Sequence, residues 1–250
     1  MHQRFHAPDL QAASTRVALP ADEAEHLTRV LRLGVGADIR VFDGRGLERE
    51  ARVVAASRRA VEVQVGAAVV PAPEPRVRIT LAHAVLKGDK TDTVFRDATT
   101  LGVAAFRPLL TARTDVPAAA FSSSRRVERW GRIVAASVKQ CGRAVLPDVA
   151  APEPIETYLA RDRPSMRLMF VEPGGPDGRE APLTGEALRA LGVPSDVHVL
   201  VGPEGGWAPD ELELARDAGC LAVTLGRRVW RADVAPTIAL GVLQFLWGDL

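Results

Sequence analysis

Residues 199–240 decide the fold of this chain and read VLVGPEGGWAPDELELARDAGCLAVTLGRRVWRADVAPTIAL. An apolar run at 197–201 ends in a Gly-rich loop, and a helical stretch then leads to a second apolar run at 221–225, which ends in Gly226. Two successive strand, loop and helix units predict a parallel sheet with two glycine-containing loops at its carboxyl edge. Open α/β folds bind ligands at this edge, so we interpret the two loops as a binding site.

The first loop, Gly202-Pro203-Glu204-Gly205-Gly206, matches neither of the common phosphate loops. It lacks the Lys-Ser/Thr pair of a P-loop and the spacing of the dinucleotide fingerprint, although its glycines let a ligand approach the backbone. Pro209 fits the first position of the following helix, and Asp210 and Glu211 place two carboxylates in its first turn, which disfavours an anion there. We therefore expect a neutral or cationic ligand. A simple turn is the alternative for this loop taken alone.

The composition is that of an ordinary globular protein. The chain has 250 residues, of which 47% are hydrophobic and 25% charged, and its formal net charge is +1. Any RNA-binding surface must therefore be a local patch. The two cysteines have no metal-ligand spacing, so we expect neither a disulfide framework nor a metal site. The N-terminus has no apolar signal region and the longest apolar stretch, 235–247, is too short to span a bilayer. We expect a cytoplasmic protein with no membrane partner.

Three prolines, Pro71, Pro73 and Pro75, indicate a stiff linker at residues 71–76 that divides the chain. The part before it, 1–70, contains short strand-like runs and a single helix, which together predict a small β-barrel. Its expected strands are 16–19, 38–42, 49–55 and 60–65, with a turn at 43–46 and the helix at 21–31.

After the linker, residues 77–250 alternate between apolar runs and helical stretches. This order predicts an α/β domain with a mostly parallel sheet covered on both faces. Residues 172–182 are expected to form a loop, and 235–247 a buried C-terminal helix. The expected strands are 77–85, 104–110, 167–171, 197–201 and 221–225, and the expected helices are 89–101, 125–141, 184–191 and 209–218.

Candidate RNA-binding residues lie in both domains. His26, Arg29 and Arg32 are spaced three apart in the first predicted helix and would form a cationic stripe, although a solvated face is the alternative. Arg4 has the same ambiguity. We also expect RNA contacts from Arg143, which ends the densest basic segment, 125–143.

Lys87 and Lys90 flank the start of a predicted helix, where Asp89 is in the N-cap position. Capping accounts for Asp89, whereas phosphate contact is the natural role for the two lysines. Trp130 is expected to be a core residue rather than a platform for base stacking.

Arg231 and Asp233 follow the second Gly-containing loop and should lie near the ligand, with a surface ion pair as the alternative for Asp233. No Ser/His/Asp triad or Cys/His pair can be assembled, so the sequence gives no support to covalent hydrolase chemistry.

With these residues in place, the chain resembles the RsmE family of ribosomal RNA methyltransferases, within the knotted SPOUT superfamily. The resemblance covers nearly the whole chain and depends on the order and spacing of several motifs. These are HLTRVLRLGVG, VFDGRG, LKGDKTD, ATTLGV, RPLLTART, RW followed by KQCGR, LVGPEGG and VTLGRRVWRADVA.

The resemblance implies a PUA-like N-terminal barrel that helps to hold RNA and a C-terminal α/β domain with a deep trefoil knot. It also implies a homodimer that uses S-adenosylmethionine to methylate N3 of one uridine in small-subunit (16S) ribosomal RNA. The cofactor-binding residues it implies are Leu200, Gly202, Pro203, Glu204, Gly205, Gly206, Leu225, Gly226, Val229, Trp230 and Arg231.

Methylation at N3 requires loss of the proton that neutral uridine carries there. We expect Arg231 to stabilise the resulting negative charge, with Asp233 as the weaker candidate for a general base. The family often has Thr-Glu-Thr where this chain has Ala232-Asp233-Val234, and this departure leaves the role of Asp233 open. Two other functions also stay open, namely a non-catalytic RNA-binding or ribosome assembly factor and a related methyltransferase that acts on another RNA.

Overall fold

The computed structural model describes residues 3–57, 59–116, 125–161, 164–173, 183–247 and 250. The chain forms two compact units, each with its own sheet. The first unit comprises Met1–Glu74 and Ala135–Leu146, and the second comprises Pro75–Val134 and Pro147–Leu250. The boundary between Glu74 and Pro75 falls inside the segment 71–76 that was predicted as a linker. However, Ala135–Leu146 belongs to the first unit, whereas the expected boundaries assign it to the α/β domain.

The first unit contains a five-stranded sheet in the order β1-β3-β4-β5-β2. Strand β1 runs parallel to β3, and the other neighbours are antiparallel. The predicted turn at 43–46 is confirmed, because the Asp43 carboxylate accepts hydrogen bonds from the backbone N–H groups of Arg45 (2.7 Å) and Leu47 (2.9 Å). The strands are β1 (Arg4–His6), β2 (Arg16–Ala18), β3 (Asp38–Phe42), β4 (Glu48–Ala56) and β5 (Val61–Val69).

The helix of this unit differs from the prediction of one continuous α-helix at 21–31. Helix α1 (Ala21–Glu25) changes into a π-helical turn, η1 (His26–Val30), in which the Leu31 N–H donates to the His26 carbonyl. Arg32 then adopts a left-handed conformation with φ of 54°. The prediction that His26, Arg29 and Arg32 share one α-helical face is therefore wrong. The π-helical turn changes the angle between successive side chains, and the left-handed conformation of Arg32 ends the helical path before that residue.

The second unit contains a parallel sheet in the order β12-β10-β11-β6-β7-β8, with β9 also paired to β7. The predicted parallel sheet is confirmed, and its central strands are apolar because helices cover both faces. The strands are β6 (Arg78–Ala84), β7 (Ala105–Leu110), β8 (Asp148–Val149), β9 (Glu153–Pro154), β10 (Met166–Phe170), β11 (Asp196–Val201) and β12 (Leu221–Val223).

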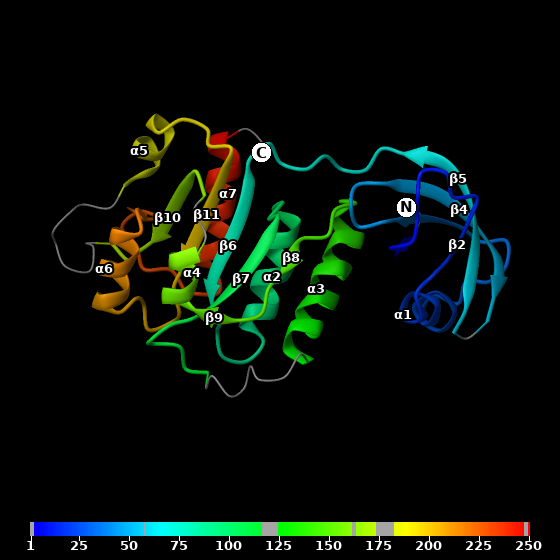
Figure 1. Cartoon of the computed structure of the whole chain (residues 1–250), viewed down its shortest axis with the longest axis horizontal. Coiled ribbons are helices and arrows are strands. Elements are labelled where there is room, and N and C mark those ends of the chain that lie inside the picture. Colours follow the sequence, from blue (N-terminus) through cyan, green and yellow to red (C-terminus); the bar gives the residue numbers. More distant parts are fainter. Residues whose placement is uncertain (1–2, 58, 117–124, 162–163, 174–182, 248–249) are drawn as a thin grey trace. The chain divides into compact units, whose positions relative to one another are not determined.

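Two helical layers enclose this sheet (Figure 1). Helices α4 and α6 pack with Leu109 and Leu200 on one face. On the other face, Phe95 of α2 stacks on Phe106 with ring centres 4.2 Å apart and also contacts Trp130, which is buried as expected. The helices are α2 (Lys90–Thr100), α3 (Arg125–Cys141), α4 (Ile155–Arg161), α5 (Gly185–Ala190), α6 (Pro209–Asp217) and α7 (Ala235–Trp247).

Four further predictions concern a loop, a helix cap, membrane-spanning helices and the knot. Of the predicted loop at 172–182, only Glu172 and Pro173 lie within the described residues. Asp89 is in the N-cap position of α2, but its side chain makes no capping hydrogen bond. Among the described residues, no helix is both long and apolar enough to cross a membrane. The trefoil knot stays a prediction.

Candidate cofactor site

A cavity of about 650 Å³ lies at the carboxyl edge of the parallel sheet. The residues that follow β10, β11 and β12 line it, together with the segment that leads into α7. Lys90, the first residue of α2 after β6, and Arg113, in the loop after β7, complete the lining. Five strand ends therefore converge on one cavity, as expected for the ligand site of an open parallel sheet.

Most of the cofactor-binding residues expected from the sequence line this cavity. Leu200 does not, because it is fully buried inside the sheet, and Gly226 is also outside the lining, in a turn with φ of 84°. The expected cofactor-binding residues found in the lining are Gly202, Pro203, Glu204, Gly205, Gly206, Leu225, Val229, Trp230 and Arg231, and the catalytic candidate Asp233 also lines the cavity.

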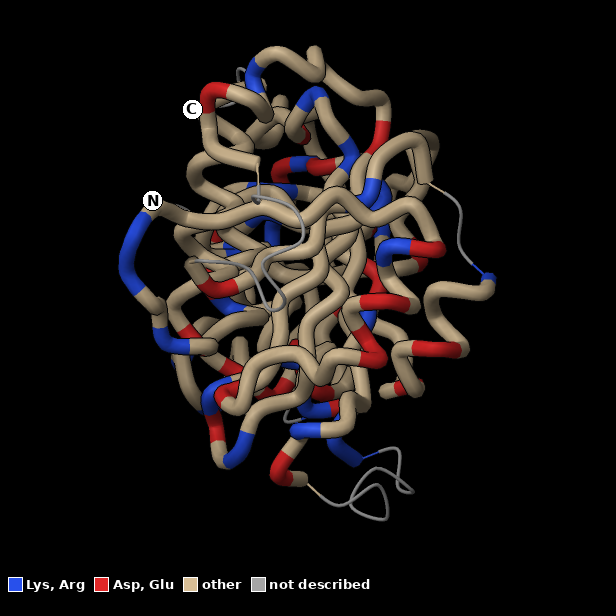
Figure 2. The backbone as a smooth tube through the Cα atoms, turned by 90° about the vertical axis from the view of Figure 1, so that its left-hand side faces the viewer, with Lys and Arg blue, Asp and Glu red and all other residues tan. Residues whose placement is uncertain are grey.

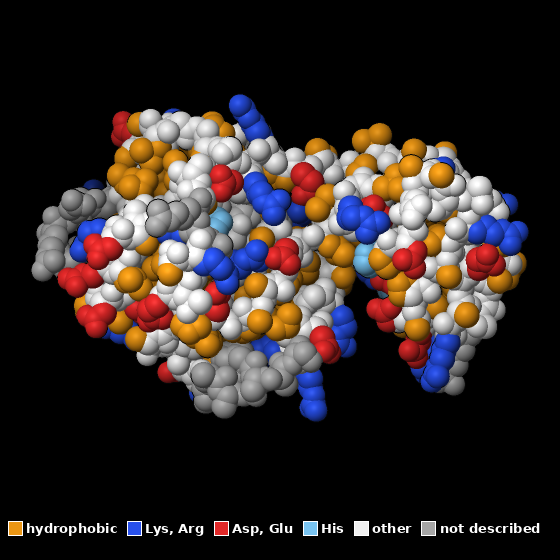
Figure 3. Space-filling model, in the orientation of Figure 1, with side chains coloured by type: hydrophobic (Ala, Val, Ile, Leu, Met, Phe, Trp, Pro, Cys, Tyr) orange, Lys and Arg blue, Asp and Glu red, His pale blue; other side chains and the backbone are white. Residues whose placement is uncertain are grey.

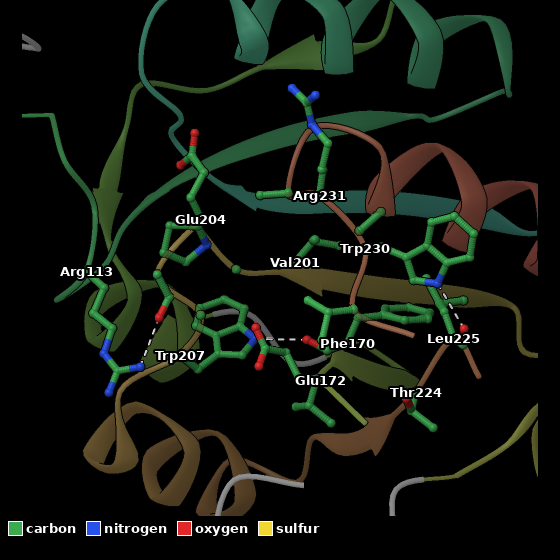
Figure 4. Close-up of a pocket in the computed structure, with 18 of the residues that line it drawn as sticks. Arg113, Phe170, Glu172, Val201, Glu204, Trp207, Thr224, Leu225, Trp230 and Arg231 are labelled. Carbon is green, nitrogen blue, oxygen red and sulfur yellow. Dashed lines mark hydrogen bonds between the residues drawn. The ribbon is translucent and has the colours of Figure 1, made fainter. Parts of the chain in front are cut away.

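The first glycine of the GPEGG loop packs directly against an indole ring. A Cβ atom on Gly202 would lie 3.0 Å from Cε2 of Trp207, which is closer than ordinary van der Waals contact. The ring cannot easily withdraw, because Trp207 is buried and its Nε1–H donates to the Phe170 carbonyl at 2.9 Å (Figure 4). Gly206 has φ of 68°, a conformation that favours glycine. Both ends of the sharp turn therefore favour glycine.

Contacts from the loop after β7 hold the same turn in place. Arg113 donates from Nη1 to the Gly205 carbonyl at 2.9 Å. The buried carboxylate of Glu211 accepts hydrogen bonds from the backbone N–H groups of Ala112 (2.7 Å) and Ala208 (2.8 Å). Glu211 thus joins the start of α6 to the loop after β7. One of the two acids at this helix start therefore has a structural role.

Two ion pairs lie at the cavity wall. Lys90 Nζ is 2.8 Å from Glu204 Oε1, and Arg231 Nε is 3.1 Å from Asp233 Oδ1. Partial burial acts to raise the pKa of Glu204, but the hydrogen bond and charge of Lys90 lower it below the usual value. In Figure 4, Glu204 and Arg231 extend towards the same side of the cavity, away from Trp207.

Several residues of the lining were not predicted from the sequence, among them Arg113, Phe170, Glu172 and Trp207. Phe170 is the last residue of β10, Glu172 lies two positions beyond it, and Arg113 lies three positions beyond the end of β7. Their signal was available, because each comes at the carboxyl end of a predicted strand. Trp207 directly follows the glycine loop, so its position in the lining could have been expected.

The expected RNA-binding residues are in very different environments. Arg4 is nearly buried, forms a bidentate pair with Glu48 and donates to the carbonyls of Val138, Lys139 and Arg143. Its charge therefore stabilises the end of α3.

Arg143 is also buried, and it pairs with Glu74. Arg29 is exposed and pairs with Glu25, while Arg32 and Lys87 are exposed. His26 is half-buried beside Phe5, and Lys90 lines the cavity.

The charges of the chain do not separate into basic and acidic regions. Acidic and basic positions are interspersed along the backbone (Figure 2), and on the face shown in Figure 3 the two kinds of side chain are also mixed. This agrees with the net charge of +1. An RNA surface must therefore be assembled from a few local cations.

Comparisons with known proteins give one consistent result. Residues 73–244 match a family model described as an RNA methyltransferase domain, and residues 19–66 match an RNA methyltransferase PUA domain. The ribosomal RNA small subunit methyltransferase E of Synechocystis is 34% identical, over 96% of this chain and 76% of its own length.

Two solved structures are also similar. A methyltransferase from Legionella pneumophila, with S-adenosylmethionine bound, has a TM-score of 0.90 and 28% identity. The ribosomal RNA small subunit methyltransferase E of Neisseria gonorrhoeae, also bound to S-adenosylmethionine, has a TM-score of 0.85 and 30% identity. Both alignments cover 100% of each chain.

Proposed function

The chain belongs to the ribosomal RNA small subunit methyltransferase E family, and from this premise we propose that it methylates small-subunit (16S) ribosomal RNA. S-adenosylmethionine is the methyl donor, and N3 of one uridine is the acceptor. The observation that carries this proposal is the cavity at the carboxyl edge, where most of the residues implied for the cofactor meet. The reaction takes place in the cytoplasm.

The cavity fits the proposed cofactor in size and in chemistry. Its volume is within the range of roughly 300–1,000 Å³ that is usual for small-molecule sites. The lining contains three carboxylates, Glu172, Glu204 and Asp233, and four cations, Lys90, Arg113, Arg228 and Arg231, which suits a ligand with both positive and negative groups. The backbones of 202–206, 225 and 229–231 would hold it through N–H and C=O groups. When bound, S-adenosylmethionine supplies a methyl group that its sulfonium already activates.

The remaining task of the protein is to stabilise the uridine after N3 loses its proton. Arg231 is the candidate for this role, since it lines the cavity and its side chain is 74% exposed. Both oxygens of Asp233 accept hydrogen bonds from Arg231, at 3.1 and 3.2 Å. This arrangement favours Asp233 as the residue that orients Arg231, rather than as a base. Charge stabilisation by a preorganised cation is then the main catalytic contribution.

The RNA-binding surface includes cations that have no acidic partner among the described residues. Arg228 lies beside the cavity with its guanidinium 5.9 Å from the centre of the Trp230 ring, and Lys87 is exposed at the same edge of the sheet. We propose that these side chains contact phosphates near the target nucleotide. In the first unit, Arg29 and Arg32 are the exposed candidates, whereas Arg4 and Arg143 are excluded by their burial.

A homodimer is the proposed assembly, and α7 offers a surface for it. Three apolar side chains are exposed along one side of this helix and just before it, namely Val234 (39%), Val242 (36%) and Phe245 (64%). Burial of such a stripe against a second copy would remove it from water. Phe245→Asp should therefore shift the protein to a monomer in analytical ultracentrifugation. A wild-type protein that is already monomeric at micromolar concentration would contradict the proposal.

Calorimetry with S-adenosylmethionine tests the function against its main alternative. The methyltransferase should bind the cofactor in the cavity, and mass spectrometry of ribosomal RNA from a deletion strain should show the loss of one methyl-uridine. Absence of binding at millimolar cofactor, with intact methylation in the deletion strain, would favour a non-catalytic assembly factor.

A further inference from the structure

A buried histidine lies beneath the segment that carries Arg231 and Asp233. His83 is in β6, the strand between β11 and β7, and only 1% of its surface is exposed. Its Nε2 atom is 3.2 Å from the Ala232 carbonyl oxygen. A carbonyl can only accept, so Nε2 carries the proton. Among the described residues, Nδ1 is buried without a hydrogen-bond partner, and the Ala232 contact is the one polar anchor of the ring.

Ala232 is the residue between the two charged side chains of the cavity wall. It is itself buried, whereas Arg231 on one side and Asp233 on the other line the cavity. The Arg231 carbonyl accepts hydrogen bonds from Val234 and Ala235, so the same short segment starts α7. Fixing the Ala232 carbonyl to the central strand thus sets the position of both charged residues relative to the sheet.

We propose that His83 is a positioning residue for methyl transfer, which holds the Arg231–Asp233 pair in place through the Ala232 carbonyl. This inference rests on the proposed function. His83 does not line the cavity and so cannot touch the substrate. Complete burial lowers its pKa to about 4, despite the nearby Glu204 and Asp233 carboxylates, which act to raise it. The ring is therefore neutral near pH 7 and acts as a fixed donor.

The tautomer of His83 provides a test that does not depend on activity. The chain has five histidines, so ¹⁵N-labelled histidine spectra are simple, and His83→Gln assigns the signal by its loss. We expect a neutral ring protonated at Nε2 in the wild-type protein at pH 7. A ring protonated at Nδ1, or a doubly protonated ring, would overturn the proposed contact whether or not the protein is a methyltransferase.

Kinetics then test what the contact does. His83→Leu removes the donor, and we expect the single-turnover rate at saturating cofactor to fall at least tenfold, because small misplacement of a reacting group is costly. His83→Gln offers an amide N–H and should recover most of this rate. Ile79→Val, a buried change in the same strand, is the matched control for lost packing and should leave the rate unchanged.

Combining His83→Leu with Arg231→Ala separates positioning from a general structural role. If His83 acts through Arg231, His83→Leu should add less than twofold to the loss already caused by Arg231→Ala. Fully multiplicative losses, or a His83→Leu enzyme with the wild-type rate, would overturn the proposal. A methyl-transfer rate that falls at low pH in the wild-type protein but not in His83→Gln would also overturn the proposal, because the ring itself would then be moving a proton. A wild-type protein that transfers no methyl group would refute the proposed function instead, and the tautomer result would stand separately.

Discussion

Gly202→Ala tests the structure of the cavity directly, because the added methyl group would overlap with the side chain of Trp207. The new Cβ atom would lie 3.0 Å from Cε2 of Trp207 and 3.2 Å from both Cδ2 and Nε1. Ordinary contact begins near 3.4 Å, so the overlap is about 0.4 Å with Cε2 and about 0.2 Å with each of the other two ring atoms. Overpacking of this kind costs roughly 1–3 kcal/mol.

Either way of relieving the overlap changes the cavity. If the GPEGG loop moves, its backbone groups leave the positions that we assign to cofactor recognition. If Trp207 moves instead, its hydrogen bond to the Phe170 carbonyl is lost, at a further cost of about 1 kcal/mol. A loss of 1.4–2.8 kcal/mol in binding corresponds to roughly 10–100-fold weaker affinity. We therefore expect the dissociation constant for S-adenosylmethionine to rise by about this factor.

Isothermal titration calorimetry measures this change, and thermal unfolding shows whether the variant is folded. Gly34→Ala is the matched control, because a Cβ atom there meets nothing within 4 Å and the backbone needs no positive φ. It should bind the cofactor as the wild type does. A folded Gly202→Ala protein with cofactor affinity within twofold of wild type would refute the steric reasoning and the assignment of this loop.

Three further predictions concern charge. Arg231→Ala should lower single-turnover methyl transfer about 100-fold while cofactor affinity is kept, and higher pH should partly restore the rate because more uridine is ionised; a near-normal rate would remove Arg231 from the mechanism. Reversal of Arg29 and Arg32 to Glu should weaken RNA binding and flatten its salt dependence, whereas an unchanged salt slope would show that both residues are merely solvated. Burial lowers the pKa of His83 from 6.5 to about 4, so the unfolded chain binds the extra proton and stability falls as the pH drops through this interval. We would measure the free energy of unfolding in denaturant at pH 7 and pH 4. Between these pH values the wild-type protein should lose roughly 3 kcal/mol more than His83→Gln does, and the same loss in both proteins would contradict the lowered pKa.

The sequence predicted the parallel sheet because its strands are long apolar runs separated by amphipathic helices. Helices α3 and α7 begin and end as expected, and the loops after β11 and β12 meet at one edge. Strands β8 and β9 were missed because two residues show no periodicity. The π-helical turn η1 was missed for another reason, since its sequence satisfies an ordinary helical pattern and only the backbone shows the wider turn.

The candidate site was predicted best where backbone chemistry dominates. The glycines of the GPEGG loop indicate a ligand-binding loop, and its position at the cavity follows because it comes at the carboxyl end of a predicted strand. Buried ion pairs were predicted poorly, because the sequence around an arginine does not show which distant acidic residue it will pair with in the fold. Arg4 and Arg143 looked like RNA contacts, yet Glu48 and Glu74, distant along the chain, neutralise them. His83 gave no signal because its partner is a backbone carbonyl 149 residues away.

Methylation of purified ribosomal subunits tests the central claim most directly. Small subunits from a strain that lacks this protein would be incubated with the protein and methyl-deuterated S-adenosylmethionine, and their RNA digested to nucleosides for mass spectrometry. The account predicts one deuterated N3-methyluridine per subunit, and at least a 100-fold slower appearance with Arg231→Ala. Absence of label in the small-subunit RNA, or label in a different nucleoside, would contradict it.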